Sequence, residues 1–173
     1  MHLLDSPFGS GIIRTHFSDN DMIKVSGVTK KYPARLAVNN ISFEVARGEI
    51  VGFLGPNGAG KTTTMRMLTG YLAMNSGSIE VAGYDVSKNP QEVRRRIGYL
   101  PESCPLYPEM RVDEYLRFRA ELKGVSSAAR KAKLNEVKEQ CGLTEVGKRI
   151  IGQLSKGYRQ RVGLADSLIH DPD

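Results

Sequence analysis

Two stretches in the N-terminal half of the chain alternate between apolar and polar residues. In residues 22–28 the apolar positions are Ile23 and Val25, and Val28 continues the series only with a break in the alternation. In residues 41–46, Ile, Phe and Val occupy every second position, with Ser, Glu and Ala between them. Such alternation places the apolar side chains on one face of a strand. The pattern therefore predicts a strand in each stretch, the second of them half-buried.

A continuous apolar run, EIVGFLG at residues 49–55, follows a predicted turn at Gly48. An unbroken run of this length is typical of a strand that is buried on both faces. Helix-forming residues then extend from Lys61 to Gly70. Glycine readily adopts the left-handed conformation that ends a helix, so the helix should stop there. Residues 78–82 predict another short strand.

The patterns of the C-terminal half are mostly helical. Asn89 and Pro90 are typical of an N-cap and a first helical position, and they predict a helix that ends near Arg96. The sequence IGYL at residues 97–100 predicts a short strand. A last helix is predicted from about residue 157 to residue 170, because its apolar residues recur at helical spacing.

Between residues 103 and 153 the sequence predicts a helical insertion. Apolar and aromatic side chains recur there at helical spacing, and each predicted helix ends at a glycine. Either of a pair of adjacent serines can cap the second helix. The positions that carry these patterns are Tyr115, Phe118, Arg119, Leu122 and Gly124 in the first helix, and Ser126 or Ser127, Leu134, Val137, Cys141 and Gly142 in the second.

Residues 1–21 differ from the rest of the chain, because they are rich in Ser, Gly, Asp and His and show no sustained period. We interpret them as a poorly ordered leader, an upstream start or a remnant of expression. The alternative is a short edge strand at residues 12–17. Residues 22–173 mix strands and helices, and they predict an α/β fold with an N-terminal antiparallel portion.

Composition adds modest constraints. The chain has 173 residues, which suits about one domain with a buried core. Its net charge of +6 fits anionic partners such as nucleotide phosphates, nucleic acid or an acidic membrane surface, and equally an ordinary soluble surface. Cys104 and Cys141 lie in no metal-ligand spacing and fit a reducing compartment. No apolar run approaches the ~18 residues of a membrane span, so a partner must provide any span.

The strongest chemical signal is GPNGAGKTT at residues 55–63, which fits the phosphate-loop (Walker A) pattern G-x-x-x-x-G-K-[ST]. Its glycines allow the backbone to turn tightly and point N–H groups at negative oxygens. Lys61 supplies a positive charge for the β and γ phosphates, and the hydroxyl of Thr62 is a ligand for Mg²⁺. The predicted nucleotide-binding residues are Gly55, Pro56, Asn57, Gly58, Ala59, Gly60, Lys61, Thr62 and Thr63.

This loop, and the order of the motifs around it, resemble the ATP-binding domains of ABC transporters over residues 22–173. The resemblance implies a P-loop nucleoside-triphosphatase core that binds ATP and Mg²⁺ and hydrolyses ATP to ADP and phosphate, with Lys61 as a catalytic residue. It also implies that Tyr32, in KKYPARLAVNNISF, stacks on the adenine ring. The alternative for Tyr32 is a ring packed at the end of a strand.

Glu102, in IGYLPESCPLYPEM, stands where the family usually has a Gln that contacts Mg²⁺ and the attacking water and faces the membrane subunit. The resemblance thus implies a catalytic and metal-binding role for Glu102. A carboxylate can accept from water or bind Mg²⁺, but it adds negative charge beside the γ-phosphate. The alternative is an ordinary surface Glu. The sequence YLPE also occurs in a branch of the family that serves exporters.

Residues 154–158, LSKGY, are similar to the family signature LSGGQ. Ser155 and Gly157 match the signature, whereas Lys156 and Tyr158 depart from it. The resemblance implies that Ser155 and Gly157 contact ATP that is bound on a second subunit, with the N-terminus of a helix directed at the γ-phosphate. Taken alone, Ser-x-Gly would be a common helix cap.

In the family, the signature helix leads to a strand that ends in Asp-Glu, and a His follows downstream. Residues 1–173 contain no apolar run after Ile169 that can form this strand. We therefore expect this chain to hydrolyse ATP slowly. We also expect the strand before the phosphate loop to have an open apolar edge, which predicts marginal stability or aggregation.

The resemblance as a whole implies the ATP-binding subunit of an ABC transporter, peripheral at the cytoplasmic face of the cell membrane, which couples ATP binding and hydrolysis to transport, with export favoured. Its implied partners are an integral-membrane transporter subunit and a second ATP-binding subunit, with a homodimer expected and no nucleic acid. The alternatives are a non-transport ABC ATPase that acts on ribosomes or DNA, and an ATP-binding module without turnover.

Overall fold

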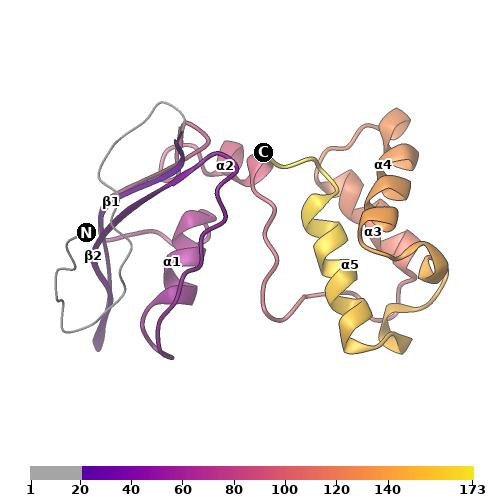
Figure 1. Ribbon diagram of the computed structural model, residues 1–173, viewed down its shortest axis with the longest axis horizontal. Coiled ribbons are helices and arrows are strands. Elements are labelled where there is room, and N and C mark those ends of the chain that lie inside the picture. Colours follow the sequence, from indigo (N-terminus) through magenta and orange to yellow (C-terminus); the bar gives the residue numbers. More distant parts are fainter. Residues whose placement is uncertain (1–20) are drawn as a thin grey trace. The chain divides into compact units, whose positions relative to one another are not determined.

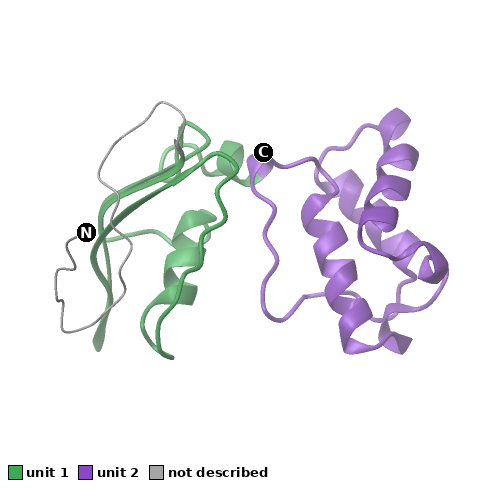
Figure 2. Cartoon of the chain, viewed as in Figure 1, with its two compact units in different colours: residues 1–94 green, residues 95–173 purple. Residues whose placement is uncertain are grey.

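A computed structural model describes residues 21–173, with side chains from Met22 onward. The expected leader at residues 1–21 and the alternative strand at residues 12–17 therefore lie almost entirely outside the described residues. The chain divides into two compact units, residues 1–94 and residues 95–173 (Figure 2). Strands occur in the first unit and helices in both, so the predicted α/β class is confirmed.

The first unit contains an antiparallel sheet with the strand order β2-β1-β3-β4. The strands are β1 (Asp21–Tyr32), β2 (Arg35–Ala46), β3 (Ser76–Val81) and β4 (Tyr84–Asp85). Three of the four strands predicted in this region are confirmed as β1, β2 and β3. The first two are longer than predicted, because they form one hairpin that pairs from Asp21 with Ala46 up to Tyr32 with Arg35.

Two helices accompany this sheet (Figure 1), α1 (Lys61–Leu68) and α2 (Pro90–Arg96). Both were predicted at these positions. Met67 and Leu68 of α1 are buried, and α1 contacts β2 and β3. Gly70 has φ 65°, in the left-handed region, as the predicted end of the helix requires. The contacts with the sheet fix where α1 begins, and thus where the glycine loop ends.

The apolar run at residues 49–55 does not form the predicted buried strand. The segment has no regular structure, and Ile50 and Leu54 are 99% and 82% exposed. A strand is held by hydrogen bonds to neighbouring strands, and among residues 21–173 no strand pairs with this segment. Phe53 alone makes a ring contact, with Phe43 of β2, at 5.7 Å between centroids. The prediction was wrong because an apolar pattern cannot provide the partner strand.

The short strand predicted at residues 97–100 is also absent. This segment has no regular structure, and Tyr99 and Leu100 are exposed. Its backbone likewise has no neighbouring strand within the described part of the chain. The physical reason is the same as for residues 49–55. A four-residue apolar pattern favours a strand through its side chains, but it does not supply the neighbouring strand whose backbone would complete the hydrogen bonds.

The second unit is helical, and its helices share one core. The helices are α3 (Val112–Leu122), α4 (Ser127–Gln140) and α5 (Lys156–Leu168), with short 3₁₀ turns at η1 (Thr144–Val146) and η2 (Ile151–Gln153). Figure 1 shows α3, α4 and α5 packed together. All three helices were predicted, including the ends at Gly124 and Gly142, which have positive φ. Ser126 is the N-cap of α4, because its Oγ accepts from the Ala129 N–H.

The core of the second unit brings together buried side chains from every one of its helices. The largest of them are Tyr115, Leu116, Leu143, Ile151 and Ile169. Burial of a large apolar side chain contributes roughly 1.5–3 kcal/mol, so this cluster dominates the stability of the unit. In residues 21–173 no helix combines the length and the apolar character that crossing a bilayer requires.

Candidate nucleotide-binding site

The glycine loop ends at a backbone contact that only glycine permits. Gly58 and Gly60 have φ values of 86° and 91°, in the region that side-chain-bearing residues rarely adopt. A Cβ built on Gly60 would lie 2.4 Å from the carbonyl oxygen of Ala37 in β2, whereas one on Gly58 would meet nothing within 4 Å. Gly60 therefore lets the loop pass close to the sheet, and α1 starts directly after it.

The start of α1 is suited to an anion. Gly60, its N-cap, offers no side-chain hydrogen bond, and the first turn contains no acidic residue. The first amides of a helix have no partner within the helix, and no acceptor is found for those of residues 61–63 in the described part of the chain. Together with the positive end of the helix dipole, these amides fit a phosphate group.

Lys61 keeps its ammonium inside the loop. Its Nζ donates to the carbonyl oxygens of Gly55 at 2.5 Å and Pro56 at 2.9 Å. A backbone hydrogen bond from Ala59 to Pro56 closes the turn around it. The loop thus brings together one ammonium group, three unpaired helical amides and no carboxylate, which is a donor set for a polyphosphate.

The threonines after Lys61 have different environments. Thr64 is buried, and its Oγ1 donates to the Gly60 carbonyl at 3.0 Å, so its role is structural. Thr62 is exposed, so its hydroxyl is free to meet a ligand such as Mg²⁺. The structure thus separates the threonine that holds the helix from the one predicted to bind the metal.

Tyr32 lies at the end of β1, in the turn that leads to β2. Its ring is 37% exposed. Two cations flank it, with Lys30 Nζ at 5.6 Å and the Arg35 guanidinium carbon at 5.9 Å from the ring centroid. A partly exposed aromatic ring with cations beside it can stack on a base that carries a phosphorylated tail. Because Tyr32 is also the last residue of β1, the stacking role and the alternative of a ring packed at a strand end both stay predictions.

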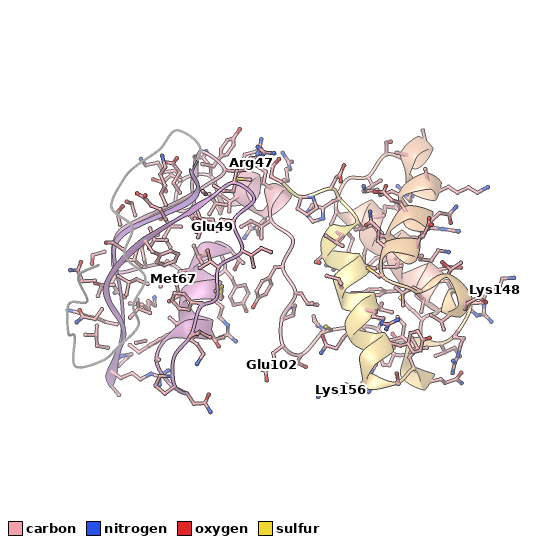
Figure 3. The ribbon with its side chains drawn as sticks, viewed as in Figure 1. Arg47, Glu49, Met67, Glu102, Lys148 and Lys156 are labelled. Atoms are coloured by element: carbon pink, nitrogen blue, oxygen red, sulfur yellow. The ribbon has the colours of Figure 1, made fainter. Side chains whose placement is uncertain are left out.

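Glu102 lies in the segment between α2 and α3, and its side chain is exposed (Figure 3). The segment is attached to α5. The Gln160 side chain donates to the Glu102 carbonyl at 3.1 Å, and the Cys104 thiol donates to the Gln160 side-chain oxygen at 3.4 Å. A Cβ on Gly163 would lie 2.5 Å from the Cys104 sulfur, so the absence of a side chain at Gly163 lets the Glu102 segment pack directly against α5.

Residues 154–158 begin α5, as predicted. The Oγ of Ser155, the N-cap, accepts from the Tyr158 N–H at 3.3 Å. The Arg159 side chain donates to the Leu154 carbonyl at 2.6 Å and so fixes the turn before the helix. Lys156 and Gly157 are exposed, and Lys156 lies at the start of α5 in Figure 3. The N-terminus of α5 thus carries two cations, Lys156 and Arg159, and no acidic residue in its first turn.

Sequence reasoning missed two side chains that hold the second unit in place. Asp166 of α5 accepts from Tyr115 and Arg119 of α3 and from Lys123, the C-cap of α3, at 3.3, 2.9 and 3.2 Å. Burial, with the Asp166 charge beside it, raises the pKa of the Tyr115 hydroxyl, and burial lowers the pKa of Lys123. Gln160 is the other missed side chain. A carboxylate among apolar residues of a helix was the available signal for Asp166.

The predicted site residues fall into two groups. The first unit holds Tyr32 and the loop at residues 55–63. The second unit holds Glu102, Ser155 and Gly157. The loop at residues 55–63 and the pair Ser155 and Gly157 lie at helix N-termini, where backbone donors are available.

Comparison with known proteins agrees on one family. Residues 38–173 match the ABC transporter family. The chain is 35% identical over 170 residues to the probable multidrug ABC transporter ATP-binding protein YbhF of Escherichia coli, covering 98% of this chain and 29% of that protein. It is 40% identical over 152 residues to the bacitracin transport ATP-binding protein BcrA of Bacillus licheniformis, covering 88% of this chain and 49% of that protein. The chain thus spans half or less of these curated relatives.

Solved structures agree on the fold. The ATP-binding subunit of an ABC transporter superposes with a TM-score of 0.78 and 30% identity, covering 87% of this chain and 63% of that one. A dimeric ATP-binding cassette in a post-hydrolysis state, bound to ADP and Pi, superposes with a TM-score of 0.76 and 24% identity. The match covers 87% of this chain and 71% of that one, and at this identity it supports the fold alone. With a family match over more than half of its residues, this chain belongs to the ABC transporter family.

Proposed function

We propose that this chain is an ATP-binding subunit of an ABC transporter, which binds Mg·ATP at residues 55–63 and couples ATP binding and hydrolysis to transport across a membrane. The single observation that carries the proposal is the start of α1. There, left-handed Gly60, the ammonium of Lys61 and unpaired amides converge at a helix N-terminus without any carboxylate. Such a set of donors suits the polyphosphate of a nucleotide.

Residues of the first unit would serve the nucleotide. Tyr32 would stack on the adenine ring, and its neighbours Lys30 and Arg35 would add positive charge. Mg²⁺, when bound, neutralises negative charge on the phosphates. The hydroxyl of Thr62 would hold it, since it is an exposed oxygen ligand of the type that Mg²⁺ prefers.

Ser155 and Gly157 would contact ATP on a second copy of the subunit. The capped, cationic N-terminus of α5 supports this role, because its dipole and Lys156 both favour a negative ligand. A dimeric cassette among the structures of the same fold is consistent with the pairing. We infer a homodimer in which each ATP lies between the loop of one copy and α5 of the other.

The partner across the membrane would be an integral-membrane transporter subunit, with this chain at the cytoplasmic face. The names of relatives include a probable multidrug transporter and a bacitracin transport protein, and these names favour export as the direction of transport. The exposed Glu102 segment, attached to α5 through Gln160, is the part that we propose to face this partner.

Calorimetric titration of the full 173-residue chain with Mg·ATP tests the loop. We expect saturable binding that Lys61→Ala abolishes, because the ammonium is the only side-chain cation inside the loop in the described structure. Lys88→Ala is the matched control, since Lys88 makes only an exposed pair with Asp85 in the same unit. Equal binding by the Lys61 and Lys88 variants would refute the assignment of the phosphate loop.

Two N-cap serines allow a test of the pairing role of α5. Ser155→Ala and Ser126→Ala each remove a side-chain cap, so each should cost about 1 kcal/mol of unfolding free energy. Only Ser155→Ala should also weaken the ATP-dependent dimer, measured by sedimentation with Mg·ATP. If both variants dimerise equally well, Ser155 is a structural cap and nothing more.

We also propose that residues 1–173 on their own turn over ATP slowly. No apolar run ending in Asp-Glu occurs in this sequence, and a general base typically contributes about 10²–10⁴-fold to a rate. Single-turnover hydrolysis with excess protein measures this. A rate on the order of 1 s⁻¹, typical of complete enzymes, would contradict the proposal.

A further inference from the structure

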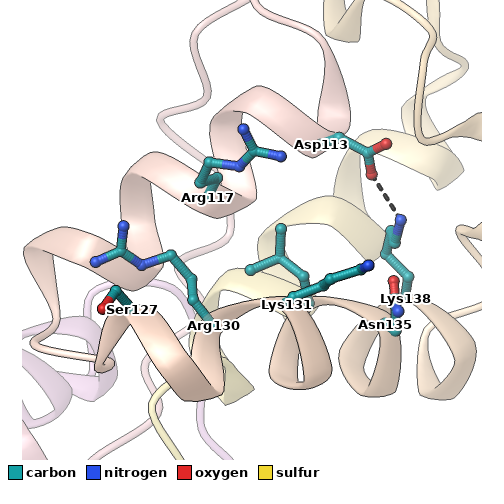
Figure 4. A pocket seen from close by; sticks show the side chains of 8 residues that line it. Asp113, Arg117, Ser127, Arg130, Lys131, Asn135 and Lys138 are labelled. Carbon is teal, nitrogen blue, oxygen red and sulfur yellow. Dashed lines mark hydrogen bonds and ion pairs between the residues drawn. The ribbon is translucent and has the colours of Figure 1, made fainter.

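A basic hollow lies between α3 and α4 of the second unit (Figure 4). Its volume is about 390 Å³, which lies within the usual range of small-molecule sites. The residues that line it are Asp113, Arg117, Ser127, Arg130, Lys131, Leu134, Asn135 and Lys138. It shares no residue with the phosphate loop, which belongs to the other unit.

The charges of this hollow do not balance. Its lining has four cationic side chains and one carboxylate. The carboxylate, Asp113, is paired with Lys138 at 2.8 Å (Figure 4). Arg130 contacts Glu121 at 3.2 Å and the Val125 carbonyl at 3.3 Å. After these pairs are made, an excess of positive charge remains.

That excess resides on Arg117 and Lys131. Both side chains are exposed, and neither makes a hydrogen bond or ion pair with any described residue. They come from different helices, and Figure 4 shows them at the same space, with Arg117 on α3 and Lys131 on α4. Two long cations that face one space repel each other, and a shared anion relieves this repulsion.

The start of α4 adds donors to the same space. The Ser126 hydroxyl caps the Ala129 amide, but no acidic residue lies in the first turn, so the positive end of the helix is not offset. Ser127, in that first turn, lines the hollow with a hydroxyl. The Nε of Arg130 is buried and finds no partner within residues 21–173. Buried Leu134 also lines the hollow.

We propose that this hollow binds a phosphate-bearing anion, held by Arg117 and Lys131, as a site separate from the ATP site. A phosphate group offers several acceptor oxygens, which can be shared between a guanidinium, an ammonium and a hydroxyl. A soluble phosphate ester and the headgroup of an acidic phospholipid present the same chemistry. A test therefore needs one soluble probe and one lipid probe.

The test uses the full chain carrying Lys61→Ala, so that the phosphate loop does not compete for the probe. One arm titrates inorganic pyrophosphate by calorimetry. The other measures co-sedimentation with phosphatidylcholine vesicles, with and without phosphatidylglycerol. Both arms are run at about 50 mM salt, where screening is modest.

The double variant Arg117→Gln/Lys131→Gln removes the unpaired cations, and neither of them supports the fold through a described contact. The matched control is Lys148→Gln/Arg149→Gln, which changes the net charge equally at exposed positions of the same unit that do not line the hollow. Far-UV circular dichroism of both variants checks that the helices persist.

We expect the first double variant to weaken binding at least about tenfold, since each lost charged contact is worth about that factor. The control should lose less than about twofold. Loss in the pyrophosphate arm identifies a soluble phosphate ligand, and loss in the phosphatidylglycerol arm alone identifies a lipid headgroup. Absence of binding in both arms, or equal loss in both double variants, would overturn the proposal.

Discussion

At the scale of single residues, the loop contains two glycines with nearly the same backbone conformation and different surroundings. Gly58 and Gly60 both have φ near 90°, which costs a residue with a Cβ about 1–2 kcal/mol. Only Gly60 also lies against another chain segment, because its absent Cβ would meet the Ala37 carbonyl at 2.4 Å. The pair therefore separates the cost of conformation from the cost of close packing.

We expect Gly60→Ala to lower the unfolding free energy of the unliganded chain by at least about 3 kcal/mol. The added methyl group must displace β2 or the start of α1, in addition to the conformational cost. Urea denaturation measures the change. Gly58→Ala is the control and should cost only about 1–2 kcal/mol, since open space surrounds it. Equal costs for both variants would show that Gly60 does not pack against Ala37.

His170 makes the stability of the second unit sensitive to pH. Its Nε2 donates to the Ile97 carbonyl at 3.2 Å, and its Nδ1 is buried without a partner in the described residues. Burial lowers the pKa of His170, and the charge of Lys123 acts in the same direction, against Asp166 and Asp171. Folding therefore favours the neutral imidazole, whereas the unfolded chain takes up a proton near pH ~6.5.

Because the unfolded state binds the extra proton, stability should fall as the pH drops below about 6.5, by up to about 1.4 kcal/mol per pH unit. Urea denaturation between about pH 7.5 and about pH 5.5 measures this slope. His170→Gln should flatten it. His2→Gln/His16→Gln serves as the control and should leave it unchanged. A slope that persists in the His170 variant would assign the effect to other groups.

At the scale of elements, α3 and α5 are joined by one carboxylate. Asp166 accepts a hydrogen bond from Tyr115 and forms ion pairs with Arg119 and Lys123. Its side chain is 16% exposed. The helix that begins at Ser155 is thus fixed to α3 as well as to the apolar core. The pair of Lys133 with Asp171 offers a comparison, because its carboxylate is far more accessible, with the Asp171 side chain 85% exposed.

We expect Asp166→Asn to destabilise the chain by about 2 kcal/mol, because it leaves the charges of Arg119 and Lys123 without a counter-charge in a half-buried place. Thermal unfolding followed at the helix signal measures the loss. Asp171→Asn is the matched control, and it should cost no more than about 0.5 kcal/mol. A cost for Asp166→Asn as small as the control's would mean that the apolar core alone joins α3 to α5.

At the scale of the whole molecule, the exposed segment at residues 49–55 is the feature most relevant to solution behaviour. Ile50 and Leu54 are exposed to 99% and 82%, next to other apolar residues without regular structure. Exposed apolar segments with free backbone groups pair readily with other chains. Aggregation therefore stays a prediction, now based on an exposed irregular segment because the expected open strand edge is absent.

The same substitution at two isoleucines tests this. Ile50→Thr should reduce aggregation, measured by light scattering during storage at room temperature, and leave the unfolding free energy within about 0.5 kcal/mol. Ile79→Thr, at a position that is only 1% exposed, should instead cost about 2–3 kcal/mol. Unchanged aggregation in Ile50→Thr would show that a different apolar surface causes the association.

Prediction from sequence succeeded where a signal and its structure are neighbours along the chain. Ser155 and Ser126 cap helices through amides three residues ahead, and Gly70 ends α1 locally. It failed at residues 49–55 and 97–100, because a strand depends on hydrogen bonds to segments that a local pattern does not specify. It also missed Asp166, whose partner Arg119 lies 47 residues away.

The sequence alone therefore determined the phosphate-loop motif, the helix boundaries and the resemblance to one family, since short-range geometry and residue chemistry decide these. The tertiary structure alone decided that Gly60 packs against Ala37, that α5 is bound to α3, and that two unpaired cations share a hollow between α3 and α4. These features depend on which distant segments meet in space, and burial and hydrogen bonding between those segments, rather than local preference, set that arrangement.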